Sequence, residues 1–317
     1  MDASQPNRSH AFQGRRTFLQ QTGAAPLAAT VGLSASAAEP QPEVALPQVQ
    51  LGPHRLSRLI CGANPFNGGS HLSTFVNRQM KEYYSPDQIL KTLRRCQEVG
   101  INTWQAGGGN VELYRRFREA GGEMHFLSIE ADRGDDQNLK RLADVGAIAC
   151  AHHGEVTDRL FKSGQIDKVH DFLKKIRDHG LQVGVSTHMP DVVDTIESKG
   201  WDLDFYMTCV YERHRSAEDL EALLGQAPIP VGEVYLPKDP PRMYESIQAT
   251  KRPCLVFKIL AAGRLSDRRH WVEQAFREAY TSIKPSDAVI VGIYDRYDDQ
   301  PADCAKLCRQ FVASASV

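Results

Sequence analysis

Eight short apolar runs, each followed by an amphipathic segment, are the feature that most constrains the fold of this chain. The runs are rich in β-branched and aromatic residues and end in glycine or polar residues. They span residues 56–64, 101–107, 124–132, 147–153, 181–188, 202–212, 253–260 and 287–295. Eight strand–helix pairs in about 260 residues match a closed (β/α)₈ TIM barrel in number and size. An open doubly wound sheet is the alternative, but the phosphate-binding pattern GxGxxG that often accompanies it is absent.

The segments between the runs have the 3.6-residue period of helices. In residues 86–100, Ile89, Leu93 and Cys96 recur on one face, and Gly100 follows as a typical helix end. Similar segments span residues 111–122, 136–146, 166–180, 191–200, 216–225, 242–250 and 270–280. We find no internal repeat and no second domain, so the sequence predicts a single α/β barrel.

The N-terminus predicts export from the cytoplasm. Arg15 and Arg16 precede Thr-Phe-Leu and a weakly apolar stretch without acidic residues, and Ala35 and Ala37 fit an A-x-A cleavage site. This segment resembles the twin-arginine export signal. We therefore expect a signal peptide over residues 1–37, a proline-rich linker over 38–54 and the catalytic barrel over 55–317. The resemblance implies a periplasmic or extracellular protein that meets the twin-arginine export machinery.

Composition limits the partners. The formal net charge of −1 provides no bulk attraction for nucleic acid or for an anionic membrane. No apolar stretch reaches the 18 residues that suggest a membrane span, so we expect none in the mature form. The seven cysteines are odd in number and four of them lie in apolar runs, which favours buried reduced thiols over a disulfide framework. A small-molecule substrate is the partner we expect.

Chemistry in TIM barrels is carried by the C-terminal ends of the strands, where this chain places many polar residues. For substrate binding, the strand ends and the loops after them offer Asn64, His71, Gln105, Tyr211, Arg264 and Asp295. Lys258 lies within the apolar run VFKIL, where an amine must find an anion or lose its proton. We therefore predict Lys258 as a catalytic acid–base or anchoring residue.

The stretch AIACAHHGEV (147–156) carries an apolar strand directly into two histidines and a glutamate. Strand alternation points His152 and His153 to opposite faces, and we assign His153 to the barrel mouth. Glu130 and His188 end the strands on either side. One carboxylate and two imidazoles can hold a divalent transition ion, so Glu130, His153 and His188 form a predicted metal site. Glu130 and His153 are also predicted catalytic residues.

Other assignments stay open from the sequence. Glu130 could instead form an ion pair with Lys258 or Arg133. Glu233, in the stretch GEVYLPKDPP, could add a carboxylate to the site, but a loop turn before a helix explains it equally well. Arg213 and Arg215 are interpreted as a solvated approach to a helix.

Several phrases resemble the aldo-keto reductase superfamily of TIM barrels. They are LSRLICGANPFNGGSH at the first strand, GINTWQAG at the second, AAGRL after the seventh and VIVGIYDRYDDQPADCAKLC at the eighth. More narrowly, GANPFNGGSH and GINTWQ resemble phrases of a group of twin-arginine-exported barrel proteins. The superfamily implies an NADP-dependent reductase, and Gly263, Arg264 and Gly292 are where a nucleotide phosphate would bind.

The catalytic set of that superfamily is mostly missing. Its aspartate position reads Trp104-Gln105, its tyrosine region reads residues 107–110, and its lysine position reads Glu130. Only its histidine survives, as His152 or His153. The departures leave no evident proton donor for carbonyl reduction.

The sequence thus favours proton-transfer chemistry on a sugar-like carbonyl compound. We expect an isomerase, epimerase or lyase, for which the predicted metal site offers a divalent ion. The alternatives are an oxidoreductase that carries a tightly bound NADP, and a barrel that binds a ligand without turnover.

The export signal gives the first testable prediction. Replacing both Arg15 and Arg16 by lysine should keep the protein in the cytoplasm as the full-length chain. The wild-type protein should appear outside the cytoplasm with its first 37 residues removed, as measured by fractionation and intact mass. Export of the double variant at the wild-type level would contradict the assignment.

Overall fold

The computed structural model describes residues 45–134, 136–213, 215–229 and 233–314. The predicted signal peptide, with Arg15 and Arg16, therefore lies outside the described residues, as does the first part of the predicted linker. The described residues belong to one compact unit.

Eight parallel strands close into a barrel in the order β10–β3–β4–β5–β6–β7–β8–β9. Each lies inside one of the eight apolar runs: β3 (Leu59–Gly62), β4 (Thr103–Gly107), β5 (His125–Glu130), β6 (Ala149–His152), β7 (Gln182–Thr187), β8 (Phe205–Cys209), β9 (Cys254–Phe257) and β10 (Ala288–Gly292). The predicted TIM barrel is confirmed.

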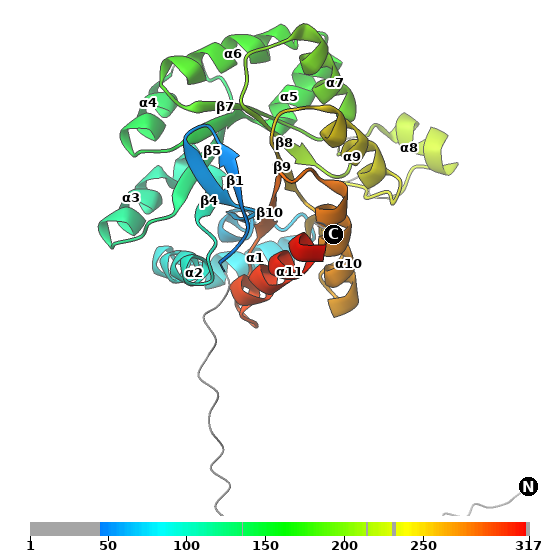
Figure 1. Cartoon of the computed structure of the whole chain (residues 1–317). Coiled ribbons are helices and arrows are strands. Elements are labelled where there is room, and N and C mark those ends of the chain that lie inside the picture. Colours follow the sequence, from blue (N-terminus) through cyan, green and yellow to red (C-terminus); the bar gives the residue numbers. More distant parts are fainter. Residues whose placement is uncertain (1–44, 135, 214, 230–232, 315–317) are drawn as a thin grey trace, which may run out of the picture. The chain divides into compact units, whose positions relative to one another are not determined.

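Helices surround the strands (Figure 1). They are α1 (Thr74–Tyr83), α2 (Pro86–Glu98), α3 (Val111–Glu119), α4 (Gln137–Asp144), α5 (Gly154–Lys162), α6 (Asp167–Asp178), α7 (Pro190–Lys199), α8 (Ala217–Leu224), α9 (Asp239–Ala249), α10 (Arg269–Ser282) and α11 (Gln300–Ser314). Short 3₁₀ turns are η1 (Pro65–Asn67), η2 (Gly108–Asn110) and η3 (Ala261–Gly263). The sequence did not predict α5, which begins directly after His153 with a glycine, a poor helix former.

The two faces of each strand belong to two different cores. Inward-facing side chains fill the barrel, among them Ile60, Leu127, Phe205, Leu255 and Ile290. Outward-facing side chains pack against the helices, among them Leu59, Trp104, Phe126, Tyr206 and Val289. A Cβ at Gly184 would lie 2.3 Å from the Phe205 ring, so glycine leaves the space that the ring occupies inside the barrel.

An antiparallel hairpin closes the N-terminal end of the barrel. It consists of β1 (Gln48–Leu51) and β2 (His54–Ser57). Its apolar residues Val49, Leu51 and Leu56 are buried in the same cluster as the inward-facing strand residues. Residues 48–54, assigned to the linker from sequence, are thus a strand and a turn of the folded unit. This end of the barrel is therefore covered by the hairpin.

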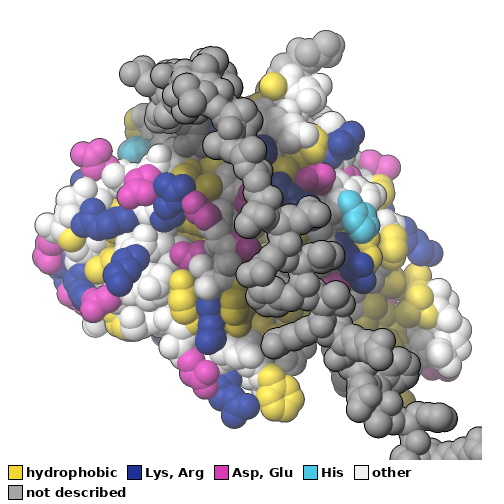
Figure 2. Space-filling view, turned by 90° about the horizontal axis from the view of Figure 1, so that it is seen from below, with side chains coloured by type: hydrophobic (Ala, Val, Ile, Leu, Met, Phe, Trp, Pro, Cys, Tyr) yellow, Lys and Arg dark blue, Asp and Glu magenta, His cyan; other side chains and the backbone are white. Residues whose placement is uncertain are grey.

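The surface has no strong charge bias. Figure 2 shows one face of the molecule, on which basic and acidic side chains are interspersed, as the net charge of −1 suggests. None of the described helices is long and apolar enough to cross a membrane. All seven cysteines lie in the described residues, and each is a buried free thiol.

The hairpin's contribution to the core can be measured. Leu51 is 2% exposed, so Leu51→Ala should lower the free energy of unfolding by about 2–5 kcal/mol in urea titrations. Gln48→Ala, at an exposed position of the same strand, should change it by less than about 0.5 kcal/mol. Equal small effects of both changes would show that the hairpin is only a linker.

Candidate active site

Polar side chains gather at the C-terminal ends of three adjacent strands. His188 follows β7, Tyr211 lies two residues beyond β8, and Lys258 follows β9 directly. Strands β7, β8 and β9 are neighbours in the barrel, so these side chains come from one sector of its mouth. The loops after β3 and after α8 add His71 and Glu233 to the same sector.

The Glu233 carboxylate is the centre of this group. Its Oε1 atom lies 2.9 Å from Lys258 Nζ and accepts a hydrogen bond from the Tyr211 hydroxyl. Its Oε2 atom lies 3.0 Å from His71 Nδ1 and 2.9 Å from Arg213 Nε. The side chains of Glu233 and Lys258 are each 8% exposed. We call these five residues the Glu233 cluster.

The cluster keeps Glu233 ionised. Burial alone would raise the pKa of its carboxyl group, but the hydrogen bond from His71, the charge of Lys258 and the hydrogen bond from Tyr211 together hold that pKa well below its usual range. A carboxylate with so low a pKa is a weak proton acceptor near neutral pH. Glu233 therefore suits an electrostatic role better than acid–base catalysis.

Two residues of the cluster have strained backbones. The φ angles of His71 and Lys258 are 56° and 62°, in the left-handed region that non-glycine residues seldom adopt. Both side chains contact the same carboxylate. Such strain persists only where surrounding contacts fix the conformation, and it concentrates at functional sites.

The Tyr211 ring lies next to the Lys258 ammonium. The Lys258 ammonium lies 5.6 Å from the centroid of the Tyr211 ring. Burial, followed by the nearby Cys209 and Glu233, raises the pKa of the Tyr211 phenol far above its usual value. Tyr211 therefore stays protonated and acts as a hydrogen-bond donor.

A buried aspartate–histidine pair lies beside the Glu233 cluster. Asp158, on α5, accepts a hydrogen bond from His188 Nδ1 at 2.7 Å, and the two side chains are 4% and 5% exposed. Thr187 Oγ1 also donates to Asp158, at 2.5 Å. Because a carboxylate only accepts, the proton of His188 lies on Nδ1 and the basic lone pair on Nε2.

Burial and three charged neighbours determine the pKa of His188. Burial lowers it below its usual value, Asp158 opposes that effect, and the charges of Lys258 and Arg213 lower it further. The imidazole is thus neutral at neutral pH. Its electrostatic response to Lys258 and Arg213 links it to the Glu233 cluster.

A glycine makes room for this pair. A Cβ at Gly154 would lie 2.9 Å from Ser186 Oγ and 3.1 Å from His188 Cε1. The first turn of α5 can therefore approach the end of β7 closely, which brings Asp158 against His188. The glycine in AIACAHHGEV is thus explained by close packing.

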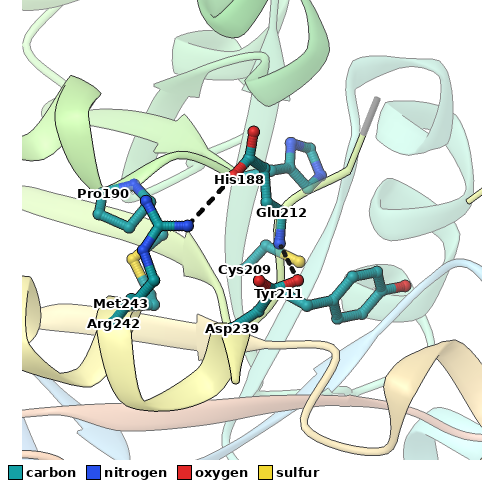
Figure 3. A pocket seen from close by; sticks show the side chains of 8 residues that line it. All are labelled: His188, Pro190, Cys209, Tyr211, Glu212, Asp239, Arg242 and Met243. Carbon is teal, nitrogen blue, oxygen red and sulfur yellow. Dashed lines mark hydrogen bonds and ion pairs between the residues drawn. The ribbon is translucent and has the colours of Figure 1, made fainter. Parts of the chain in front are cut away.

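An ionic layer supports the end of β8. Arg215, 6% exposed, pairs with Asp239, 4% exposed, at 2.6 Å, and with Glu212 at 3.0 Å. Figure 3 shows Glu212 and Asp239 with Arg242 and His188 around a small pocket that Tyr211 also lines. Arg215 is therefore a buried ion-pair partner, and its interpretation as a solvated residue is wrong.

Asn64 and Arg264 brace the loops of the cluster. Asn64 Nδ2 lies 3.2 Å from His71 Nε2. Arg264 donates to the main-chain oxygens of Ala261 at 2.9 Å, of Glu233 at 2.9 Å and of His71 at 3.3 Å. Arg264 thus ties three loops together, and in this arrangement its donors are directed at carbonyl oxygens.

Two predicted substrate-binding residues lie elsewhere. Gln105 is buried and pairs with Gly62, on the inward face of β4. Asp295 accepts hydrogen bonds from Tyr84 at 2.9 Å and from Thr92 at 2.8 Å, which anchors the loop after β10 to the α1–α2 region. Neither has a described contact with the Glu233 cluster. Gly292 is one of the positions where a nucleotide phosphate was expected. A Cβ added to Gly292 would lie 2.8 Å from Pro65 Cδ, so Pro65 already fills that side of the glycine.

Glu130 and His152 lie outside the Glu233 cluster. Glu130 shares the strand face of Phe126, and that ring stacks on Tyr114 in the helix layer. Its carboxylate accepts from Gly108 N at 2.6 Å, with neither Lys258 nor Arg133 as a described partner. His152 points outward, bonds Thr157 Oγ1 at 2.7 Å and packs on Phe172.

The residues predicted to hold a metal ion do not come together. No group of three or more His, Cys, Asp or Glu side chains in the described residues is arranged to bind one. Glu130 lies toward the helix layer, and His188 Nδ1 is bound to Asp158. His153 Nδ1 is buried without a hydrogen-bond partner in the described part of the chain. The three residues do not fit a common ion, so we derive no step through a metal.

Asp158 was not predicted from the sequence, because it lies on the helix that the sequence did not reveal. Glu233 was left open as a possible carboxylate of the site, and the structure places it at the centre of the cluster. Arg213 pairs with both Glu233 and Glu155, so its interpretation as a solvated residue is wrong. The buried amine of Lys258 was the signal that an anion had to lie nearby.

Comparisons with known proteins show the fold alone. No family model matches the chain, and no curated protein matches it. A DAHP synthase of Thermotoga maritima is 12% identical with a TM-score of 0.50, covering 86% of this chain and 74% of the synthase. A glycerol dehydrogenase of Gluconobacter oxydans is 12% identical with a TM-score of 0.46, covering 84% of this chain and 96% of the dehydrogenase. The synthase is similar to this chain in fold alone.

His152 gives a prediction about pH. Burial, followed by the neighbouring His153, lowers its pKa from 6.5 to about 4, with Asp132 opposing. The unfolded chain therefore takes up this proton first on acidification. Stability from His152 is complete above pH 6.5 and is lost as pH falls toward 4, by up to about 1.4 kcal/mol per pH unit.

The measurement is the free energy of unfolding in urea between pH 7.5 and pH 4.5. His152→Gln should flatten the fall relative to wild type, whereas the same change at exposed His270 should leave the slope unaltered. Identical slopes for the wild type and His152→Gln would contradict the assignment.

Proposed function

We propose that this protein is an enzyme that moves a proton on a carbonyl compound, a sugar derivative, as an isomerase, epimerase or lyase. One observation carries the proposal. The neutral, Asp158-bound His188 follows β7, and the buried Lys258 ammonium follows β9, with only β8 between the two strands. Enolisation requires a base and a cation in the same part of an active site.

His188 is the proposed base. With its Nδ1 proton held by Asp158, the imidazole can accept a proton at Nε2, and the aspartate stabilises the imidazolium that forms. The low pKa of His188 keeps it ready to accept at neutral pH. Asp158 is the residue that positions the ring.

Lys258 is the proposed partner of the carbonyl oxygen. As a proton leaves the adjacent carbon, negative charge develops on that oxygen, and a fixed ammonium can stabilise it. An ammonium has three N–H donors, and Glu233 Oε1 takes one of them in the described contacts. The single O–H of Tyr211 is donated to the same Glu233 oxygen, so Tyr211 positions the partner of the lysine. Enolisation of this kind needs no nucleotide.

The proposed place of action is the periplasm or the extracellular space, reached through the twin-arginine pathway. The proposed substrate in that compartment is a small soluble molecule. Sugar derivatives carry hydroxyl groups, which the polar residues of this barrel mouth can bind. Export motivates this part of the proposal, and the first prediction above tests it.

Solvent exchange tests the reaction class without knowledge of the product. A panel of aldoses, ketoses and sugar acids is incubated in D₂O, and loss of the proton next to the carbonyl is followed by ¹H NMR. The wild type should exchange that proton in at least one compound. His188→Asn and Lys258→Met should each slow the exchange roughly 10²–10⁴-fold.

Matched controls are Lys174→Met and His270→Asn, both at exposed positions, which should exchange at the wild-type rate. Binding of a panel compound with no exchange by the folded wild type would favour a ligand-binding barrel without turnover. Nucleotide released from the purified protein, with its absorbance, would instead favour the oxidoreductase.

A further inference from the structure

We infer that the Glu233 cluster is a binding site for a carboxylate of the substrate. In the absence of substrate, the Glu233 carboxylate occupies the position that the substrate carboxylate would take. The inference rests on the proposed function, because it names the substrate class as acidic sugars or other carbonyl compounds that carry a carboxylate. It also makes a claim about anion binding that can be tested without turnover.

The cluster contacts both oxygens of one planar group. Oε1 accepts hydrogen bonds from Lys258 and Tyr211, and Oε2 lies within ion-pair distance of His71 and Arg213 without an aligned hydrogen bond in the described residues. Two contacts for each oxygen match a carboxylate, whereas a phosphate would present a third oxygen with no contact assigned to it. The site therefore selects a carboxylate by shape as well as by charge.

Glu233 is the one carboxylate in the described contacts of Lys258, whereas Arg213 also pairs with Glu155. Glu155 is 43% exposed, so solvent screens its effect on Arg213. When the Glu233 side chain leaves, the buried Lys258 ammonium requires another anion, which a substrate carboxylate provides.

The exchange needs only a side chain to move. The main-chain oxygen of Glu233 accepts from Arg264 Nη2 at 2.9 Å, and the same guanidinium holds the oxygens of His71 and Ala261. These bonds fix the backbone on both sides of the cluster. Rotation about the side-chain bonds of Glu233 then vacates the position while the four donors stay in place.

The anion site adjoins the proposed base. His188 and Tyr211, a member of the Glu233 cluster, line the same small pocket. We therefore place the carbon atoms next to a bound carboxylate on the side of the Asp158–His188 pair. This arrangement favours proton removal from a carbon close to the acid group.

Removal of the Glu233 side chain provides the test. Acetate should bind to Glu233→Ala and raise its melting temperature saturably, by about 3 °C or more at saturation, with ionic strength kept constant by chloride. Wild type and the double variant Glu233→Ala/Lys258→Met should show no such rise. Equal responses of all three proteins would overturn the inference.

A second measurement does not depend on the stability of the variants. Calorimetry on the wild type should show that glucuronate or gluconate binds at least tenfold more tightly than glucose, and Lys258→Met should remove the difference. Neutral sugars that bind equally well, or that alone undergo exchange, would overturn the inference while leaving the proposed reaction class standing. Acid binding without any exchange would instead refute the proposed function and leave the anion site.

Discussion

The ion pair between Lys258 and Glu233 is the interaction on which the arrangement of the mouth depends. Both side chains are almost fully buried, and a buried charge without a partner costs several kcal/mol. The pair joins the loop after β9 to the loop that follows α8, and His71 brings in the loop after β3. Loops from three parts of the chain are thereby held over the same strand ends. The strained backbones of His71 and Lys258 persist because these contacts fix both residues.

The sequence predicted the fold well because each strand of the barrel has a local sequence pattern. A strand with one face in the barrel and the other against the helices needs apolar residues at successive positions. All eight strands accordingly lie within the apolar runs. The pattern does not say which of the two strand faces points inward. Glu130 lies on the same strand face as Phe126, and that face belongs to the helix layer, whereas the predicted metal site required Glu130 to point into the barrel mouth. A shift by one residue exchanges the two faces, so a site assigned by alternation alone can be lost as a whole.

The candidate site was predictable only in part, for a related reason. Lys258, Tyr211 and His71 were named as candidates because a polar residue at the end of an apolar run, or in the loop that follows it, is a local signal. Their common partner, Glu233, comes from a proline-rich loop whose path depends on Arg264 and on long-range contacts. The sequence required an anion for Lys258 but offered several carboxylates, and propensity does not rank them. Asp158 was missed because its helix begins at a glycine that is explained only by packing against His188.

Two groups of opposite electrostatic character lie at this barrel mouth. The Asp158–His188 pair is buried and carries one negative charge, whereas the adjoining cluster contains two cations beside Glu233. The cations lower the proton affinity of His188, and Asp158 raises it. An anion that took the place of Glu233 would bring its own carbon atoms to a base already neutral, while the fixed cations stayed to receive developing negative charge. Binding and proton removal would then draw on the same Lys258 ammonium, which links the choice of substrate to the chemistry.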